Sequence, residues 1–285
     1  MLLASDRNEL AHSSARAANN LREELGLSDI VPGCPFEAAH ALGVSVRITD
    51  INMEGIYARV PRPTIILSCF RPFGRRVFNA AHELGHHVFG HGTTLDQLQE
   101  RNVQASWEDP DEFLADIFAG FFLMPLLGIR RCFNVRNWSV EHASAKQIYL
   151  VACDLGVGYR TLITHLTYSL RLLTSQRARE LKMVDLRKLR ADILGENTSC
   201  HLTLAGPNRA GGKIDLEAGA YLAVPSGTVV DSSHLEPVKN NQIGFILRAS
   251  RPGVTVIAKQ NWRATVRIQR SEYVGLAQYR HMEEL

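Results

Sequence analysis

The chain has 285 residues, of which 45% are hydrophobic and 21% charged, and its formal net charge is +3. This apolar content excludes a disordered chain, and the length allows one large domain or two of medium size. The net charge neither indicates nor excludes a nucleic-acid partner, because the distribution of charge decides such binding.

Five cysteines, an odd number, are scattered along the chain without a C-x-x-C pair. This excludes a disulfide framework and a zinc ribbon and indicates a reducing compartment. The first residues, MLLASDRNEL, lack the apolar segment of a signal peptide. The longest apolar run, residues 117–129, is too short to cross a bilayer. We therefore expect a soluble, cytoplasmic protein without a membrane partner.

Helices and short strands alternate in the first half of the chain. Apolar residues on a helical period and breaks at glycine and proline mark the helices, whereas β-branched runs mark the strands. In the second of two long helices, Asp109 is the expected N-cap and Pro110 occupies the first helical position. The predicted elements are helices over 5–27, 36–42, 77–89 and 109–123, and strands in VSVRIT, GIYARV and TIILS.

The pattern changes in the second half. A helix pair, 139–154 and 159–173, surrounds LGVGYRT, and a polar, basic stretch follows. From about residue 198 the chain consists of short β runs such as GFILRA, VTVIAK and ATVRIQ. The sequence therefore predicts an α+β chain, with one domain over 1–183 that includes the hairpin 139–173, and a mostly β domain over 184–285.

Histidines concentrate in one helix, where His82-Glu83-Leu84-Gly85-His86 forms the pattern H-E-x-x-H. At 3.6 residues per turn, His82 and His86 share one face and can converge on a metal ion. Glu83 lies to one side, where it can take a proton from the attacking water. Chance produces this pattern about 0.025 times in a chain of this composition, so the match favours a catalytic Zn²⁺ site.

A catalytic zinc needs a third protein ligand and one open position. The favoured ligand is Glu112, which lies on the next helix in an apolar segment where a carboxylate must be paired or bound to metal. Asp116 shares its face and is expected to accept the spare ring N–H of a ligating histidine. Alternatively, Asp116 is an ordinary acid on the helix surface. His91 stands one residue out of register for the third histidine of extended H-E-x-x-H motifs.

Two motifs in this order, HELGHHVFGH and Glu112-x-x-Ala-Asp116-x-Phe-Ala, followed by Leu-Met-Pro125, resemble the ImmA/IrrE family of bacterial metallopeptidases. The resemblance covers roughly residues 10–175. It implies a minimal zincin-like domain with zinc on His82, His86 and Glu112 and with Glu83 as general base and acid. Family members typically cut a helix-turn-helix repressor, which relieves transcription of stress or antiphage genes.

The hairpin 139–173 suits a helix-turn-helix-like extension, which members of this family also carry. The simpler interpretation is an ordinary helical hairpin that closes the protease domain or docks the substrate. We favour the simpler one, because the second helix lacks a dense basic face.

Charge is uneven in the β-rich part, since no acid occurs between Glu236 and Glu272. A basic β surface with an aromatic ring is what a single-stranded nucleic-acid groove needs, whereas charge runs more often mean a solvated face or a site for an acidic protein. Some antiphage-operon proteases, the CapP-like proteins, are thought to respond to DNA. The candidate DNA-binding residues are Lys239, Arg248, Arg251, Lys259, Trp262, Arg263, Arg267 and Arg270.

A protease that destroys a repressor must stay idle until it is signalled. A thiolate in the open position of the zinc is one route to inhibition. Cys69, which follows the strand before the H-E-x-x-H helix, is the first candidate, and Cys34 is the second. A lone cysteine is more often simply a small buried residue.

The metal motif and the resemblance together predict a regulatory zinc endopeptidase. The resemblance implies that it cleaves a helix-turn-helix repressor, and the basic β surface makes single-stranded DNA a candidate activator. The alternative is a non-catalytic regulator that keeps zinc for structure and binds DNA or a repressor. An intact Glu83 disfavours the alternative, because a structural zinc site needs no base beside the metal.

Overall fold

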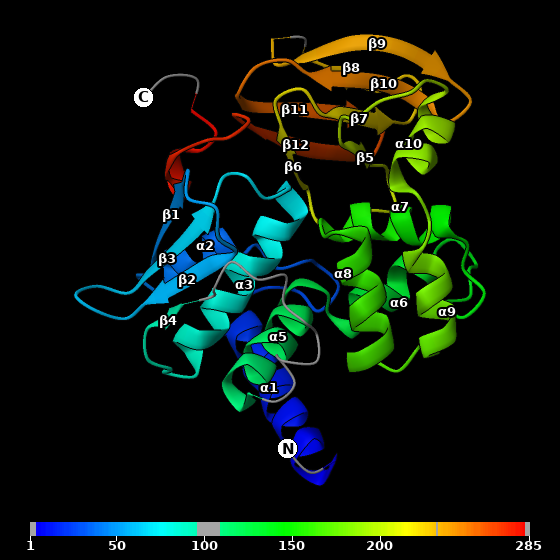
Figure 1. Ribbon diagram of the computed structural model, residues 1–285. Coiled ribbons are helices and arrows are strands. Elements are labelled where there is room, and N and C mark those ends of the chain that lie inside the picture. Colours follow the sequence, from blue (N-terminus) through cyan, green and yellow to red (C-terminus); the bar gives the residue numbers. More distant parts are fainter. Residues whose placement is uncertain (1–3, 96–108, 232, 283–285) are drawn as a thin grey trace. The chain divides into compact units, whose positions relative to one another are not determined.

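The computed structural model describes residues 4–95, 109–231 and 233–282 (Figure 1). The chain divides into two compact units, one formed by residues 1–128 and 272–278 and the other by 129–271 and 279–285. The predicted boundary at 183/184 therefore differs from the observed division, and the helical hairpin falls in the second unit. The Tyr149 hydroxyl of this hairpin donates to the Leu202 carbonyl in the first strand of the β-rich region, 2.5 Å away.

The first unit contains a mixed five-stranded sheet of order β13-β1-β3-β2-β4 (Figure 1). β1 and β3 are parallel, and the other neighbouring pairs are antiparallel. The edge strand β13 comes from the far end of the chain and pairs with Arg47 and Ile48 of β1. The strands are β1 (Ser45–Thr49), β2 (Gly55–Ala58), β3 (Thr64–Ser68), β4 (Thr94–Leu95) and β13 (Gly275–Leu276).

The helices of this unit follow the predicted order. α3 packs on β2 and β3, α5 packs on α3, and α1 packs on α5. α3 begins at Phe73, four residues before the predicted start. The prediction was late because the buried position 76 in the first turn is an arginine and not an apolar residue. Asp109 caps α5 as predicted and accepts a hydrogen bond from the Asp111 N–H at 2.9 Å. The helices are α1 (Ala4–Glu24), α2 (Pro35–Ala41), α3 (Phe73–Val88) and α5 (Pro110–Leu123).

The buried Arg22 ties α1 to the end of α5. Its guanidinium donates to the carbonyl of Phe122 at 2.7 Å and to the carbonyls of Ser28 and Val31 at 2.7 and 2.6 Å. Burial lowers the pKa of Arg22, although the nearby Asp29 acts in the opposite direction. Three backbone acceptors thus satisfy a cation that is only 1% exposed.

The second unit begins with a group of helices. α7 starts later than predicted, because Ser144 and Gln147 form a capping box there. α9 and α10 occupy the stretch interpreted from the sequence as polar and basic, and the side chains of Thr174 and Asp185 cap them. The helices are α6 (Leu126–Asn134), α7 (Ala145–Leu155), α8 (Tyr159–Thr164), α9 (Ser175–Lys182) and α10 (Leu186–Leu194), with a π-helical turn η1 (His165–Ser169) after α8.

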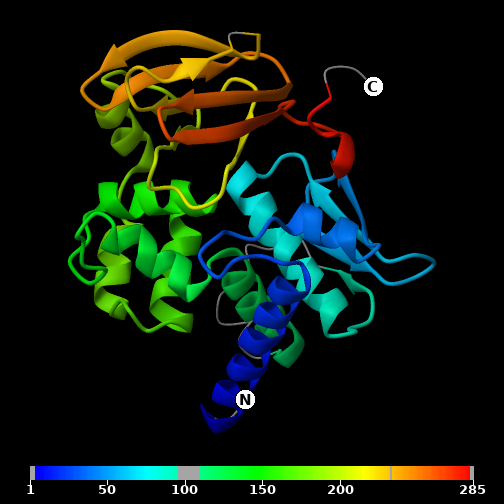
Figure 2. The same ribbon diagram turned by 180° about the vertical axis from the view of Figure 1, so that it is seen from behind.

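Two four-stranded sheets follow, of order β5-β7-β10-β9 and β6-β12-β11-β8 (Figure 2). Their inner faces share one apolar core. Ala264, Val266 and Ile268 of β12 point into this core, as the alternation predicts. The strands are β5 (Leu202–Leu204), β6 (Lys213–Glu217), β7 (Tyr221–Val224), β8 (Val229–Val230), β9 (Leu235–Asn241), β10 (Gly244–Ala249), β11 (Gly253–Lys259) and β12 (Trp262–Gln269).

The structure confirms a mixed α+β chain with a β-rich C-terminal region. Within the part of the chain that the structure describes, no disulfide joins the five cysteines. Across the described residues, no single helix has the length and apolar character to span a membrane, although α5 and α6 taken together as a bent pair pass that test by length and composition alone.

Candidate metal centre

α3 places both motif histidines deep in the first unit. His82 is 1% exposed and His86 is 0% exposed, and their Nε2 atoms lie 3.0 Å apart. One helical turn separates the two residues, so their rings project from the same face of α3. The spacing predicted from the sequence therefore yields two converging nitrogen atoms.

α5 carries the third ligand to this point because it approaches α3 closely. A Cβ atom added at Gly85 would lie 3.1 Å from the Cα of Ala115, so the glycine permits the short distance between the helices. Across this contact, the Glu112 carboxylate lies 3.4 Å from the Nε2 atom of His82 and 3.4 Å from that of His86. His82, His86 and Glu112 thus form a group of ligand atoms within 4.8 Å of one another.

The donor set fits a zinc ion. Tetrahedral Zn²⁺ at about 2.0–2.1 Å from nitrogen and oxygen separates its ligand atoms by about 3.3–3.4 Å. The three separations of 3.0, 3.4 and 3.4 Å are close to that value. Two imidazoles and one carboxylate are also the ligands of a catalytic zinc that keeps one position open.

Asp116 holds the first ligand from behind. Its Oδ1 lies 2.8 Å from the Nδ1 atom of His82, and the carboxylate side chain is 28% exposed. When Nε2 faces a metal, Nδ1 carries the proton and donates it to the carboxylate. Asp116 and His82 are thus within hydrogen-bond distance, and support of a metal-bound His82 by Asp116 stays a prediction.

The second ligand also has a partner behind it. The Nδ1 atom of His86 lies 2.8 Å from the Nδ1 atom of His91, and the Nε2 atom of His91 lies 3.3 Å from Oδ1 of Asp111. Burial lowers the pKa of His91, although Asp111 acts in the opposite direction. This contact was not predicted from the sequence, in which His91 stands out of register for a third ligand.

Glu83 is fully buried and adjoins β2. A Cβ atom at Gly55 would lie 2.6 Å from Oε1 of Glu83, so a side chain at this position of β2 would displace the carboxylate. Two residues further along β2, the Tyr57 hydroxyl lies 2.9 Å from Nδ1 of His87. Burial raises the pKa of Tyr57 and lowers that of His87, so both groups favour their neutral forms.

A polar cluster beside Gly55 fixes the start of β2 against α3. The buried Glu54 carboxylate accepts from Arg75 at 2.8 Å and from the Asn79 amide at 3.0 Å, and its other oxygen lies 2.9 Å from Nε of Arg71. Asn79 also donates to the Glu54 carbonyl at 3.0 Å. Sequence reasoning missed this cluster, whose signal was an Asn and an Arg one turn apart before the motif.

Cys69 is buried at the end of β3, and its N–H donates to the Thr49 carbonyl at 2.7 Å. Burial raises the pKa of its thiol, and the nearby Glu272 acts in the same direction. Cys34 is half-buried and precedes α2 as its N-cap. Among the described residues, the group of ligand atoms contains no sulfur, and inhibition by either thiol stays a prediction.

The basic candidates of the β-rich region occupy different environments. Trp262 is 8% exposed and belongs to the core between the sheets, so the predicted stacking of bases on this ring is wrong. Arg267 donates to both oxygens of Asp215, at 2.8 and 2.5 Å, and Lys239 lies 2.7 Å from Glu196. Lys259 donates to the Ser226 carbonyl. Arg270 is half-buried, whereas the exposed members of the predicted set are Arg248, Arg251 and Arg263.

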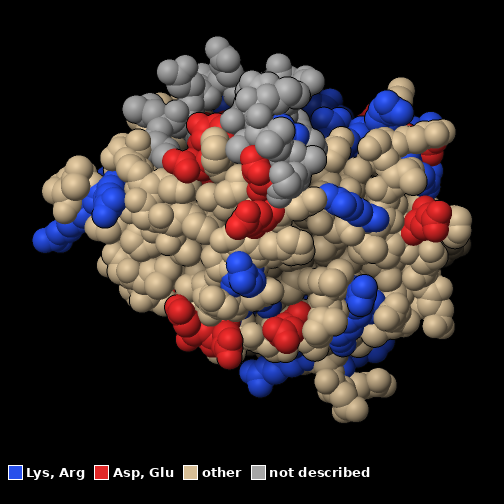
Figure 3. Space-filling model, turned by 90° about the horizontal axis from the view of Figure 1, so that it is seen from below, with Lys and Arg blue, Asp and Glu red and all other residues tan. Residues whose placement is uncertain are grey.

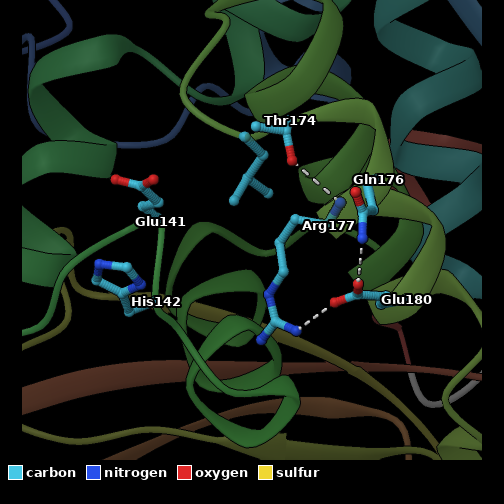
Figure 4. Close-up of a pocket in the computed structure, with 7 residues that line it drawn as sticks. Glu141, His142, Thr174, Gln176, Arg177 and Glu180 are labelled. Carbon is cyan, nitrogen blue, oxygen red and sulfur yellow. Dashed lines mark hydrogen bonds and ion pairs between the residues drawn. The ribbon is translucent and has the colours of Figure 1, made fainter.

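In the described part of the chain, neither a hollow in the second unit nor the face drawn in Figure 3 points to a second site. A hollow in the second unit is lined by polar residues, and its Arg177 donates to Glu180 at 2.9 Å and to the Ala143 carbonyl at 2.9 Å (Figure 4). The positive charge of Arg177 is therefore already paired with Glu180. On the face drawn in Figure 3, Lys and Arg are interspersed with Asp and Glu rather than gathered in one basic patch.

Comparison with known proteins agrees with this geometry. Residues 39–166 match the IrrE N-terminal-like domain of peptidase family M78. No curated protein matches the chain. Among ten matching chains of solved structures, a Mycobacterium tuberculosis transcriptional regulator has 21% sequence identity and a TM-score of 0.36. The match covers 55% of this chain and 46% of that one, so less than half of the regulator's length is spanned.

The matched residues contain the whole His82, His86 and Glu112 group together with Glu83. The chain therefore carries a domain of the ImmA/IrrE family of metallopeptidases.

Proposed function

We propose that the chain is a regulatory zinc endopeptidase that cleaves a helix-turn-helix transcriptional repressor and so induces a stress or antiphage operon. One observation carries the catalytic part. The ligand atoms of His82, His86 and Glu112 converge within 4.8 Å, and the carboxylate of Glu83 lies on the same helix between the two histidines. A purely structural zinc site has no use for such a carboxylate.

The residues divide the work of peptide hydrolysis. His82, His86 and Glu112 would hold a zinc ion, which polarises the scissile carbonyl and lowers the pKa of water. Glu83 takes the proton of the attacking water and later protonates the leaving amine. Burial of Glu83 excludes bulk water from this proton transfer.

The substrate class is proposed from the resemblance to the ImmA/IrrE family. Members of the ImmA/IrrE family typically cut helix-turn-helix repressors, and the regulatory role of this chain is proposed on that basis. The helix pair α7 and α8, expected to be helix-turn-helix-like or an ordinary hairpin, is proposed as a docking element for the repressor. Such a role uses exposed positions on these helices, such as Lys146 of α7 and Arg160 of α8, and leaves their buried faces in the core of the second unit.

Single-stranded DNA is proposed as the activating signal. Support comes from the exposed Arg248, Arg251 and Arg263, which can contact phosphates. With Trp262 in the core, binding would depend on these charges and fall steeply with salt. Replacing the three arginines by glutamine should then remove activation by an oligonucleotide while basal cleavage remains. Unchanged activation would exclude these three arginines as the binding site.

The decisive experiment for the enzyme is Glu83→Gln in the full zinc-loaded chain. Incubated with the helix-turn-helix protein encoded beside its gene, the wild type should cut it, and the variant should keep its zinc and lose cleavage by a factor of about 10³ or more. Glu141→Gln, at an exposed position of the second unit, is the matched control. If Glu83→Gln still relieves repression in cells, the chain is a non-catalytic regulator.

A further inference from the structure

His91 returns to the metal centre because α3 ends in a tight reversal. The Gly90 φ angle is +68°, in the left-handed region that favours glycine. The His91 N–H then donates to the His86 carbonyl at 3.0 Å, and the Gly90 N–H donates to the His87 carbonyl at 3.1 Å. This pair of hydrogen bonds is the Schellman motif of helix C-termini. It brings the chain back beside the ligand that lies one turn earlier.

The ring of His91 is fixed on two sides. It stacks on Phe89 with ring centroids 5.6 Å apart and an interplanar angle of 23°. Its Nδ1 faces His86 at 2.8 Å, and its Nε2 faces Asp111 at 3.3 Å. With its side chain 11% exposed, His91 lies between a buried histidine and a carboxylate at the first turn of α5.

Metal ligation fixes the direction of both hydrogen bonds. With Nε2 of His86 turned toward the ligand group, the proton of that ring is on Nδ1, which must donate. The Nδ1 atom of His91 must then accept, so the His91 proton is on Nε2 and points to Asp111. Every donor in the series points away from the metal, and each of the two imidazole rings carries one proton.

We propose that His91 is a positioning residue of the metal centre, which holds the ring orientation and tautomer of His86 and is itself oriented by Asp111. The proposal deepens the proposed function, because it rests on metal binding by His86. It gives the second ligand the kind of support that Asp116 gives to His82, with one imidazole inserted before the carboxylate. Outer partners of ligating histidines typically contribute about 10–100-fold to metal affinity.

The test measures zinc affinity of the full chain by competition with a chromophoric chelator, together with the visible spectrum of the cobalt-loaded protein. His91→Phe keeps a ring against Phe89 and removes both nitrogens, so zinc should bind about 10–100-fold more weakly and the cobalt bands should shift. His91→Asn keeps an acceptor near the Nδ1 position and should stay within about threefold of the wild type. The matched control is His87→Phe, because the Nδ1 atom of His87 faces the Tyr57 hydroxyl and not a metal ligand.

Zinc affinity of His91→Phe within about threefold of the wild type would overturn the proposal, as would an equal loss in His87→Phe. If His91→Phe does not fold, Asp111→Asn decides, because this side chain is 61% exposed and its loss leaves the core unchanged. A loss of zinc affinity of about threefold or more in Asp111→Asn then supports the proposal, and a smaller change overturns it.

The two proposals fail in different ways. If the variants behave as expected but the wild type cuts no repressor, the proposed function fails and the assignment of His91 stands. If His91→Phe binds zinc like the wild type and the repressor is still cut, the assignment fails and the function stands. A wild type that binds no zinc would overturn both, with the failure visible before any variant is made.

Discussion

Gly55 and Glu83 lie so close that any side chain at position 55 would meet the carboxylate of this glutamate. A Cβ atom added at Gly55 would be 2.6 Å from Oε1 of Glu83 and 3.1 Å from its Cγ. β2 therefore forms one wall around the proposed general base. The adjacent Glu54, held by Asn79 of α3, fixes where that wall begins.

Gly55→Ala should displace the Glu83 carboxylate and leave the metal ligands in place. Because misplacement of a reacting group by about 1 Å can cost about 10²-fold, we expect kcat for repressor cleavage to fall about 10–100-fold with zinc content unchanged. The measurements are cleavage kinetics and metal analysis. Gly92→Ala is the control, since nothing lies within 4 Å of a Cβ there. Wild-type kinetics in Gly55→Ala would contradict the assigned contact.

Asp116→Ala should weaken zinc binding about 10–100-fold, because the Nδ1 proton of His82 loses its carboxylate acceptor. Competition with a chelator measures this affinity, and the variant should lose its metal at lower chelator concentrations than the wild type. Asp50→Ala removes an exposed carboxylate from the end of β1 and serves as the comparison. Equal affinities in the two variants would mean that Asp116 is only a surface acid.

Arg22→Met should lower the free energy of unfolding by about 3 kcal/mol, because three carbonyl groups lose a charged donor, that of Phe122 in the core. Urea unfolding followed by circular dichroism measures the change. Arg16→Met, on the same helix and exposed, is expected to stay within about 0.5 kcal/mol of the wild type. A similar small change in Arg22→Met would show that water replaces the guanidinium.

The second unit should lose stability as the pH falls below 6.5. Burial, and next the neighbouring Arg280, lower the pKa of His281 from 6.5 to about 4, while Asp215 acts in the opposite direction and Arg267 adds to the lowering. Between these pH values the unfolded chain binds the proton that the folded chain excludes, so acidification favours unfolding. This difference in pKa corresponds to about 3 kcal/mol of folding stability, which is present above pH 6.5 and is lost as the pH falls toward 4.

Unfolding midpoints measured between pH 7 and pH 4 check this expectation. His281→Gln should flatten the pH dependence relative to the wild type, whereas His142→Gln, at an exposed position, should leave it unchanged. A slope that His281→Gln does not alter would place the responsible group elsewhere.

Several parts of the site could be predicted because they depend on contacts within one helix. The four-residue spacing of His82 and His86, and that of Glu112 and Asp116, places each pair on one face whatever the surroundings. The alternation in β12 likewise predicted its inward-facing residues. In contrast, α9 and α10 were missed, since side-chain caps rather than an apolar period define them.

The charges of the β-rich region could not be interpreted from the sequence, although the alternation in β12 also applies to its aromatic ring. Arg267 and Asp215 are 52 positions apart and meet only because β12 pairs with β6. Trp262 faces inward because it belongs to the alternating set that fills the core. The number of exposed cations in this region is therefore smaller than the basic run in the sequence indicates.

The sequence by itself determined that this chain has a metal-binding helix, a carboxylate helix after it and a β-rich region at its end. Only the tertiary structure decided that Gly85 lets those helices approach, that Glu112 meets His82 and His86, and that β13 completes the first sheet. The physical reason is one of range. Helical period and strand alternation act over a few residues, whereas partners 30 or more positions apart, such as His82 and Asp116, meet only when packing brings their elements together.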